Sequence, residues 1–170
     1  MPDIQTEITP ITAQVDGNTV NAKRLTVVSV IPGTLEEVWR LFQRVDTMTN
    51  AARGMMGFKA VSPAPHPELW PVGQEVVMKT YLLQVLPMGE HRIEFVEWDD
   101  ERHLARTQER GGATQMWNHT IRMTAIGPTE TRVVDQIDIY AGRMTGLIVW
   151  FARRFYKHRR GRWHLGLEGW

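Results

Sequence analysis

His119 and Asp135 form a histidine–carboxylate combination for which a catalytic role can be argued from the sequence. They lie in two neighbouring segments, 115–126 and 131–140, that we predict to be β-strands joined at Gly127-Pro128. Side chains alternate along a strand, and pairing across this turn brings the imidazole diagonal to the carboxylate on one face. A carboxylate beside an imidazole orients it and raises its basicity, as a general base requires. Three roles are open for the pair: catalysis, contact with a polar group of a ligand, or mutual satisfaction in the core.

The rest of this predicted face is apolar. Methionine is abundant in the chain, with nine residues, and its flexible thioether suits a cavity that adapts to different ligands. Ordinary core packing explains the same methionines, so the sequence is consistent with both an adaptable cavity and a filled core. The candidate ligand-binding residues, given as one set, are Trp117, His119, Ile121, Met123, Asp135, Ile137, Met78, Met144, Ile148 and Phe151.

The sequence offers little for other chemistry. It contains no cysteine, which excludes disulfides, thiol nucleophiles and cysteine-bound zinc. Its six histidines show no close two-ligand spacing on one element, and no phosphate-binding loop or nucleophile elbow occurs. We therefore expect no metal site and no cofactor.

Local signals divide the chain into elements that would position these residues. The β-branched run 23–31 predicts a strand, and Thr34 with Glu37 three residues later has the spacing of a capping box. That helix should end near Val45, and a second short helix is expected at 48–56. The remaining predicted strands are 58–61, 75–85, 92–98, 103–109, 115–126 and 131–140, with turn-like breaks at Pro87-Met88-Gly89, Asp99-Asp100, Gly111-Gly112 and Gly127-Pro128.

The last element changes its period. Apolar residues recur at helical spacing from Met144 to Phe155, which predicts one helix over about 142–160 with an apolar stripe on the sheet. The expected fold is α+β of the helix-grip type: a curved antiparallel sheet of about six to seven strands wrapped around this long C-terminal helix, with two short helices after the first strand. Residues 1–22 form an N-terminal extension or an extra hairpin, and residues 23–170 form the ligand-binding domain.

Charge is unevenly distributed, although the net charge is only +1. From Arg143 onward the chain has seven Lys and Arg residues and one acid. An anionic membrane surface could bind Arg153, Arg154, Lys157 and Arg160. The alternative is that the bases coat the solvated face of the helix and favour its C-terminal dipole. No recognition-helix motif is present, so we do not expect nucleic acid as a partner, and we expect a monomer or a homodimer.

The order of elements resembles the START and pollen-allergen-like helix-grip superfamily, and within it the polyketide cyclase/dehydrase and coenzyme-Q-binding branch. The residues that carry this resemblance are Trp117-x-His119, Thr131-x-x-x-Asp135, and Gly142 and Gly146 at the start of the final helix. Members of this superfamily bind lipids, hormones, polyketides or quinones, and only some are enzymes. The resemblance implies a cavity between the sheet and the last helix.

The expected function is binding of a hydrophobic small molecule, either a lipid, a quinone or a polyketide-like compound. One alternative is a cyclase/dehydratase-like enzyme that uses His119 and Asp135, and another is a surface-associating lipid carrier that uses the basic helix. The first ten residues include Asp3 and Glu7 and have no apolar core, and no run of 18 apolar residues occurs. We therefore expect a cytoplasmic protein.

Overall fold

A computed structural model describes residues 4–61 and 65–163. Within them the fold begins with a long hairpin of strands β1 (Ile4–Val15) and β2 (Asn18–Pro32). Asp16 and Gly17 join the two strands with positive φ values of 49° and 78°. Asp-Gly suits this left-handed two-residue turn, whose twist matches that of the flanking strands.

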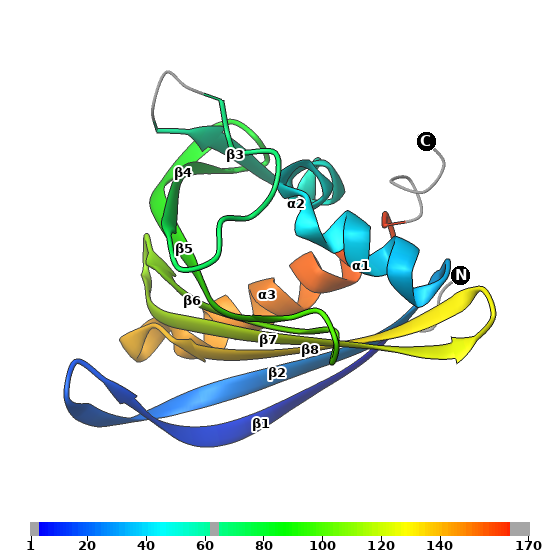
Figure 1. The fold of residues 1–170 in the computed structure, drawn as a ribbon. Coiled ribbons are helices and arrows are strands. Elements are labelled where there is room, and N and C mark those ends of the chain that lie inside the picture. The colour runs from blue at the N-terminus through cyan, green and yellow to red at the C-terminus, as the bar shows by residue number, and fades with distance from the viewer. Residues whose placement is uncertain (1–3, 62–64, 164–170) are drawn as a thin grey trace.

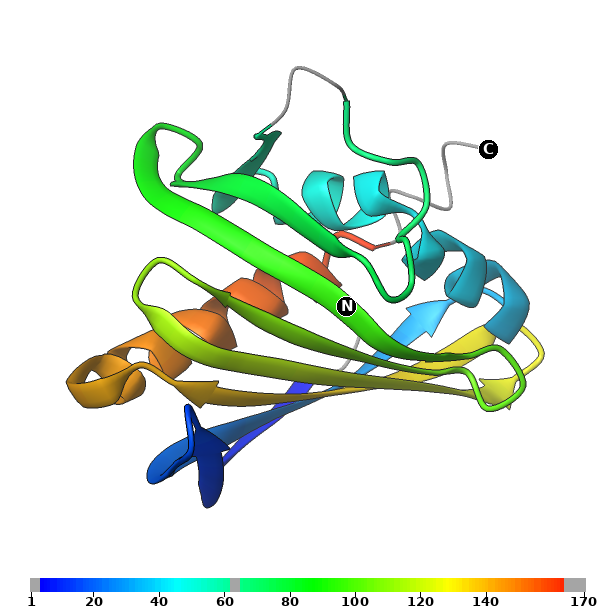
Figure 2. The same ribbon diagram turned by 60° about the vertical axis from the view of Figure 1, so that its left-hand side comes forward.

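The described residues form one antiparallel sheet of eight strands in the order β1-β2-β8-β7-β6-β5-β4-β3. The sheet is curved, and helices cover its concave side (Figures 1 and 2). It has more strands than the six to seven expected, because β1 adds a full strand at one edge. The other strands are β3 (Met56–Ala60), β4 (Glu75–Leu82), β5 (Leu86–Asp99), β6 (Leu104–Gly111), β7 (Thr114–Gly127) and β8 (Glu130–Tyr140).

Two short helices follow β2. Helix α1 (Leu35–Gln43) begins at the predicted capping box: the Thr34 hydroxyl accepts from the Glu37 backbone N–H, and the Glu37 carboxylate accepts from the Thr34 backbone N–H. Helix α2 (Val45–Ala52) begins directly after it, three residues earlier than predicted. The capping-box prediction is confirmed.

The final helix crosses the concave side of the sheet. A 3-10 turn (Gly142–Met144) leads into α3 (Thr145–Arg160), which lies inside the curve of the sheet in both views (Figures 1 and 2). Its packed face is small and apolar, with Val149 and Ala152 buried against Leu25 and Val27 of β2. No helix in the described part of the chain is long and apolar enough to span a membrane.

The predicted apolar stripe of this helix does not pack on the sheet along its length. Met144 and Leu147 are 47% and 57% exposed, whereas Phe155 is buried. The reason is that α3 rests on β2 and β8, so that the stripe is turned away from these strands. It faces the half of the sheet that α3 leaves uncovered.

The turn expected at 87–89 lies at 83–85 instead. Leu83 and Gln84 make it with positive φ values of 50° and 65°. Pro87 is part of β5, where it pairs with β4, and β6 pairs with β5 only from His91 onward. The missing N–H of a proline costs little where a strand has a neighbour on only one side.

A second core fills the end of the molecule beneath α1. It is rich in aromatic rings, including Trp39, Phe42 and Trp98, whose centroids lie 4.8–5.7 Å apart. The indoles of Trp39 and Trp98 both donate to Asp100 Oδ1, at 2.7 and 3.0 Å. This arrangement ties the first helix to the β5–β6 turn.

Candidate functional site: a cavity with two histidine–carboxylate pairs

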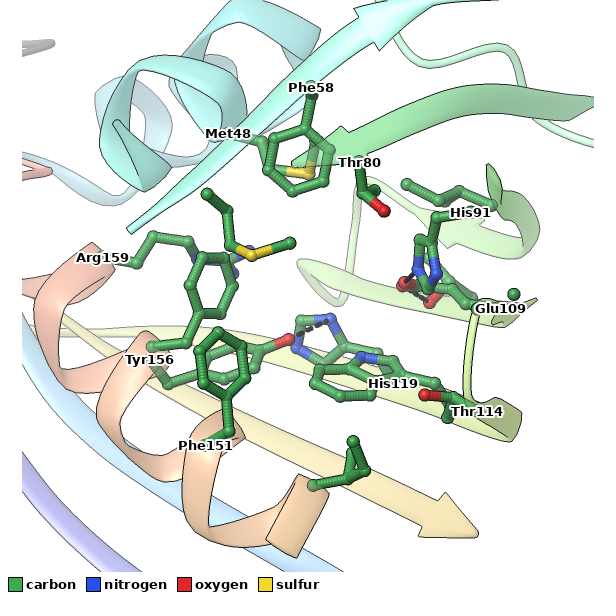
Figure 3. A pocket seen from close by; sticks show the side chains of 18 of the residues that line it. Met48, Phe58, Thr80, His91, Glu109, Thr114, His119, Phe151, Tyr156 and Arg159 are labelled. Carbon is green, nitrogen blue, oxygen red and sulfur yellow. Dashed lines mark hydrogen bonds and ion pairs between the residues drawn. The ribbon is translucent and has the colours of Figure 1, made fainter. Parts of the chain in front are cut away.

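A cavity of about 380 Å³ lies between α3 and the part of the sheet formed by β4 to β7 (Figure 3). Most of its lining is apolar. Its volume falls within the range of roughly 300–1,000 Å³ that small-molecule pockets occupy. It occupies the region that α3 does not cover, because the helix packs on β2 and β8.

Six of the ten predicted binding residues line this cavity: Trp117, His119, Ile121, Met144, Ile148 and Phe151. The other four do not. Met78 and Met123 pack in the aromatic core, Ile137 packs beneath α3, and Asp135 is fully buried behind His119. Met123, Asp135 and Ile137 lie on the predicted face of β7 and β8, but packing against the helices and neighbouring side chains fills the space over them.

His119 lies where the pairing across the β7–β8 turn predicted. It is opposite Ile137 in the strand register. Its Nε2 is 2.8 Å from Asp135 Oδ1, and its Nδ1 is 3.3 Å from the Tyr156 hydroxyl of α3. The predicted contact between imidazole and carboxylate is therefore present, and Tyr156 is a partner that sequence reasoning missed.

The charge states of the flanking groups assign the protons in this chain. Burial opposes ionisation of Asp135, but the Arg160 charge and the hydrogen bond from His119 outweigh it, so the pKa of Asp135 lies below its usual range. An ionised Asp135 requires the proton on His119 Nε2. Burial raises the pKa of Tyr156, which therefore keeps its hydroxyl proton beside His119 Nδ1.

Asp135 is held from its other side by the end of α3. Arg160 Nε donates to Asp135 Oδ2 at 2.8 Å, and a second guanidinium nitrogen contacts both carboxylate oxygens. Neither side chain is exposed. The prediction that Arg160 binds an anionic surface is wrong, because its guanidinium is buried in the ion pair with Asp135. Arg153, Arg154 and Lys157 are exposed.

A second histidine–carboxylate pair faces the same cavity and was not found from the sequence. His91 Nε2 lies 2.8 Å from Glu109 Oε2, and the Thr107 hydroxyl donates to Glu109 Oε1 at 2.6 Å (Figure 3). Burial opposes ionisation of Glu109, but the hydrogen bond from His91, the electrostatic influence of the His91 and His119 rings and the Thr107 hydroxyl outweigh it and lower the pKa. Alternation along β5 and β6 could in principle have placed His91 and Glu109 on one face. A register shift between Phe95 and Glu97 prevents their pairing from being worked out by counting residues from the β5–β6 turn.

The imidazoles of the two pairs differ in their hydrogen bonds and in their exposure to the cavity. Both ring nitrogens of His119 have partners inside the protein, so this ring holds Tyr156 and Asp135 in place. His91 is bonded at Nε2, and its side chain is 18% exposed at the cavity. Neither pair belongs to a group of three possible metal ligands among the described residues.

Most of the chain matches one known protein family. Residues 29–164 match the family described as "Domain of unknown function (DUF8410)". No curated protein matches the chain. The description of this family names no activity.

Solved structures with a similar fold are distant in sequence. A START superfamily protein from Mycobacterium smegmatis is 11% identical with a TM-score of 0.59, over 84% of this chain and 97% of that one. Norcoclaurine synthase from Thalictrum flavum, in complex with dopamine and hydroxybenzaldehyde, is 11% identical with a TM-score of 0.56, over 99% and 90%. The Zhui aromatase/cyclase from Streptomyces sp. R1128 is 10% identical with a TM-score of 0.52, over 85% and 87%. The predicted helix-grip fold is confirmed.

Proposed function

Because this chain belongs to the family described as "Domain of unknown function (DUF8410)", whose description names no activity, we propose its function from the cavity: it binds a hydrophobic small molecule. The observation that carries the proposal is a space of about 380 Å³ enclosed by mainly apolar side chains of α3 and the sheet. A lipid, a quinone or a polyketide-like compound fits this description. Apolar ligands gain free energy from leaving water in proportion to the area they bury.

The distribution of packing on α3 supports this proposal. Val149, Ala152, Phe155 and Tyr156 are buried, while Ile148 and Phe151 line the cavity and are only partly buried. A helix that served only to close the core would bury Ile148 and Phe151 as well. These two side chains thus remain available for a ligand.

Two measurements test the proposal: a search for a copurifying ligand, and probe binding by a variant whose cavity is filled by a larger side chain. Native mass spectrometry of the purified protein should reveal a copurifying apolar compound. N-phenyl-1-naphthylamine, a neutral fluorescent probe, should bind the wild type, and Ile148→Trp should weaken that binding at least tenfold by filling the cavity. The matched control is Lys157→Trp, which adds the same side chain at an exposed position of α3. Equal probe binding by both variants would contradict the proposal.

A cyclase/dehydratase-like reaction at His119 and Asp135 is the alternative. A general base must reach a proton of its substrate. His119 has no ring nitrogen free for this task while Tyr156 and Asp135 keep their hydrogen bonds. Binding without reaction is therefore the preferred function.

A surface-associating carrier is a second candidate, favoured by the residues at the cavity mouth. Exposed Leu147 and Trp150 line the cavity and share α3 with the exposed cations Arg153, Arg154 and Lys157. Apolar side chains beside cations suit the interface of an anionic bilayer. Binding to phosphatidylglycerol vesicles should weaken with salt and in the triple variant with glutamine at the three cations, while phosphatidylcholine vesicles serve as the control. Equally absent binding to both vesicles would contradict this candidate.

A further inference from the structure

Arg159 is a buried cation on the wall of the cavity. Its side chain is 7% exposed and extends from α3 toward the interior, beside Tyr156 (Figure 3). The guanidinium carbon lies 4.6 Å from the centroid of the Tyr156 ring and 5.9 Å from that of Phe155. These ring contacts stabilise the charge but accept none of its hydrogen bonds in the plane of the guanidinium.

The hydrogen-bonding capacity of Arg159 is not met within the described residues. Its Nε is buried and has no partner there. Its closest carboxylate oxygen is Asp135 Oδ1, 3.9 Å from one terminal nitrogen, which is an ion-pair distance and too long for a hydrogen bond. That oxygen already accepts from His119 and Arg160.

Arg159 has no carboxylate of its own. Arg159 and Arg160 bring two positive charges to the single carboxylate of Asp135. Glu109, which lines the cavity, is held by His91 and Thr107 and makes no ion pair with Arg159 among the described residues. A buried charge is costly unless it is paired and hydrogen-bonded. One positive charge at the cavity is thus left without a full partner.

A second unmatched group points to the same ligand chemistry. Trp163 also lines the cavity, is 2% exposed, and its indole Nε1–H has no acceptor in the described part of the chain. Arg159 and Trp163 can only donate hydrogen bonds. The unmatched polar atoms on the cavity wall therefore require acceptors, which a carboxylate offers and an alcohol or amine offers less well.

We propose that Arg159 binds the carboxylate of the cavity's ligand, which is therefore an amphipathic organic acid with an apolar body. This inference rests on the proposed function and specifies the class of ligand. A single uncompensated charge favours a monoanion, and the planar guanidinium matches a carboxylate in geometry. The apolar remainder of the lining would hold the hydrocarbon part of the acid.

The experiment compares two ligands that differ only in the polar end. Dodecanoate and 1-dodecanol displace N-phenyl-1-naphthylamine in competition at neutral pH. We expect the wild type to bind dodecanoate about tenfold to a hundredfold more tightly than dodecanol, since hydrogen bonds to charged groups have this weight. Arg159→Gln should bring the two affinities within about twofold of each other while dodecanol binding persists.

Two further variants separate this role from folding and from surface charge. Arg159→Lys keeps the charge but not the planar fork, so it should retain a reduced preference for the acid, and it stands in if Arg159→Gln does not fold. Arg153→Gln removes an exposed cation of the same helix and should keep the wild-type preference. An unchanged preference in a folded Arg159→Gln protein, or a wild type that binds both ligands equally, would overturn the inference and leave the proposed function intact. Failure of the probe and of both ligands to bind would instead overturn the proposed function.

Discussion

Asp135 and Arg160 form an ion pair in which neither side chain is exposed to solvent. Asp135 lies in the middle of β8, and Arg160 ends α3, so this pair fixes the end of the helix to the sheet. His119 contacts the same carboxylate from β7. The ion pair, and the imidazole bonded to it, form the polar centre of an otherwise apolar interior.

Removing Arg160 should destabilise the protein strongly. Arg160→Met leaves the Asp135 carboxylate buried with incomplete compensation, which typically costs about 3–5 kcal/mol. Urea-induced unfolding measures the change, and the exposed Arg153→Met is the matched control with an expected change within about 0.5 kcal/mol. The double variant Asp135→Leu/Arg160→Met should be less destabilised than Arg160→Met alone. A double variant that is worse than both single variants would show that the charges themselves are net stabilising.

The hydrogen bond between Tyr156 and His119 should contribute to stability. Tyr156→Phe keeps the ring and leaves His119 Nδ1 buried without its hydroxyl partner, so we expect a loss of about 1–3 kcal/mol in urea-induced unfolding. His119→Gln should cost at least as much, because it disturbs partners on both sides. Binding of N-phenyl-1-naphthylamine should change less than twofold in either variant. Full stability in His119→Gln would remove the structural role that we assign to this imidazole.

The pairing of β7 with β8 was predictable because the signals for it are local. The turn at Gly127-Pro128 and the alternation along both strands are enough to place His119 opposite Ile137, and the structure has this register. The capping box at Thr34 is equally local. The overall helix-grip architecture followed from the order of such elements.

The orientation of α3 was not predictable, because two of its faces are apolar. The stripe through Ile148 and Phe151 has the larger side chains, yet the face with Val149 and Ala152 is the one that packs on the sheet. Small side chains allow the helix to approach β2 closely. No local sequence pattern indicates that the face with the smaller residues is the one that packs on the sheet. The ion pair of Arg160 with Asp135 was also not predictable from local sequence. Asp135 is 25 residues away, and Arg160 lies in a run of basic residues of the kind usually found on the surface.

Stability should fall at acidic pH because of buried carboxylates. The pKa values of Asp135 and Glu109 are lowered in the folded protein, so the unfolded chain takes up protons first as the pH drops. The stabilisation is present above the ordinary values of about 4 and is lost progressively below them. Urea-induced unfolding between pH 7 and pH 3 measures this slope, which Glu109→Gln should reduce relative to Glu36→Gln, a change at an exposed carboxyl. Identical slopes in these two variants would contradict the role of Glu109.

Two glycine-to-alanine changes should have opposite effects. Gly111 ends β6 with φ at +143°, and a Cβ there would lie 2.1 Å from the Glu90 carbonyl oxygen and 2.8 Å from His91 Cα. Because backbone blocks the new methyl group, Gly111→Ala should cost about 3 kcal/mol in urea-induced unfolding and displace the strand that holds His91. Gly146 lies in α3, where a Cβ would be no closer than 3.8 Å to Lys23 Nζ, so Gly146→Ala should be neutral or stabilise by up to about 1 kcal/mol. The His91 imidazole signals in an NMR spectrum should shift in a Gly111→Ala protein that still folds and stay in place in Gly146→Ala. A Gly111→Ala protein as stable as the wild type would mean that β5 and β6 are not in such close contact at this point.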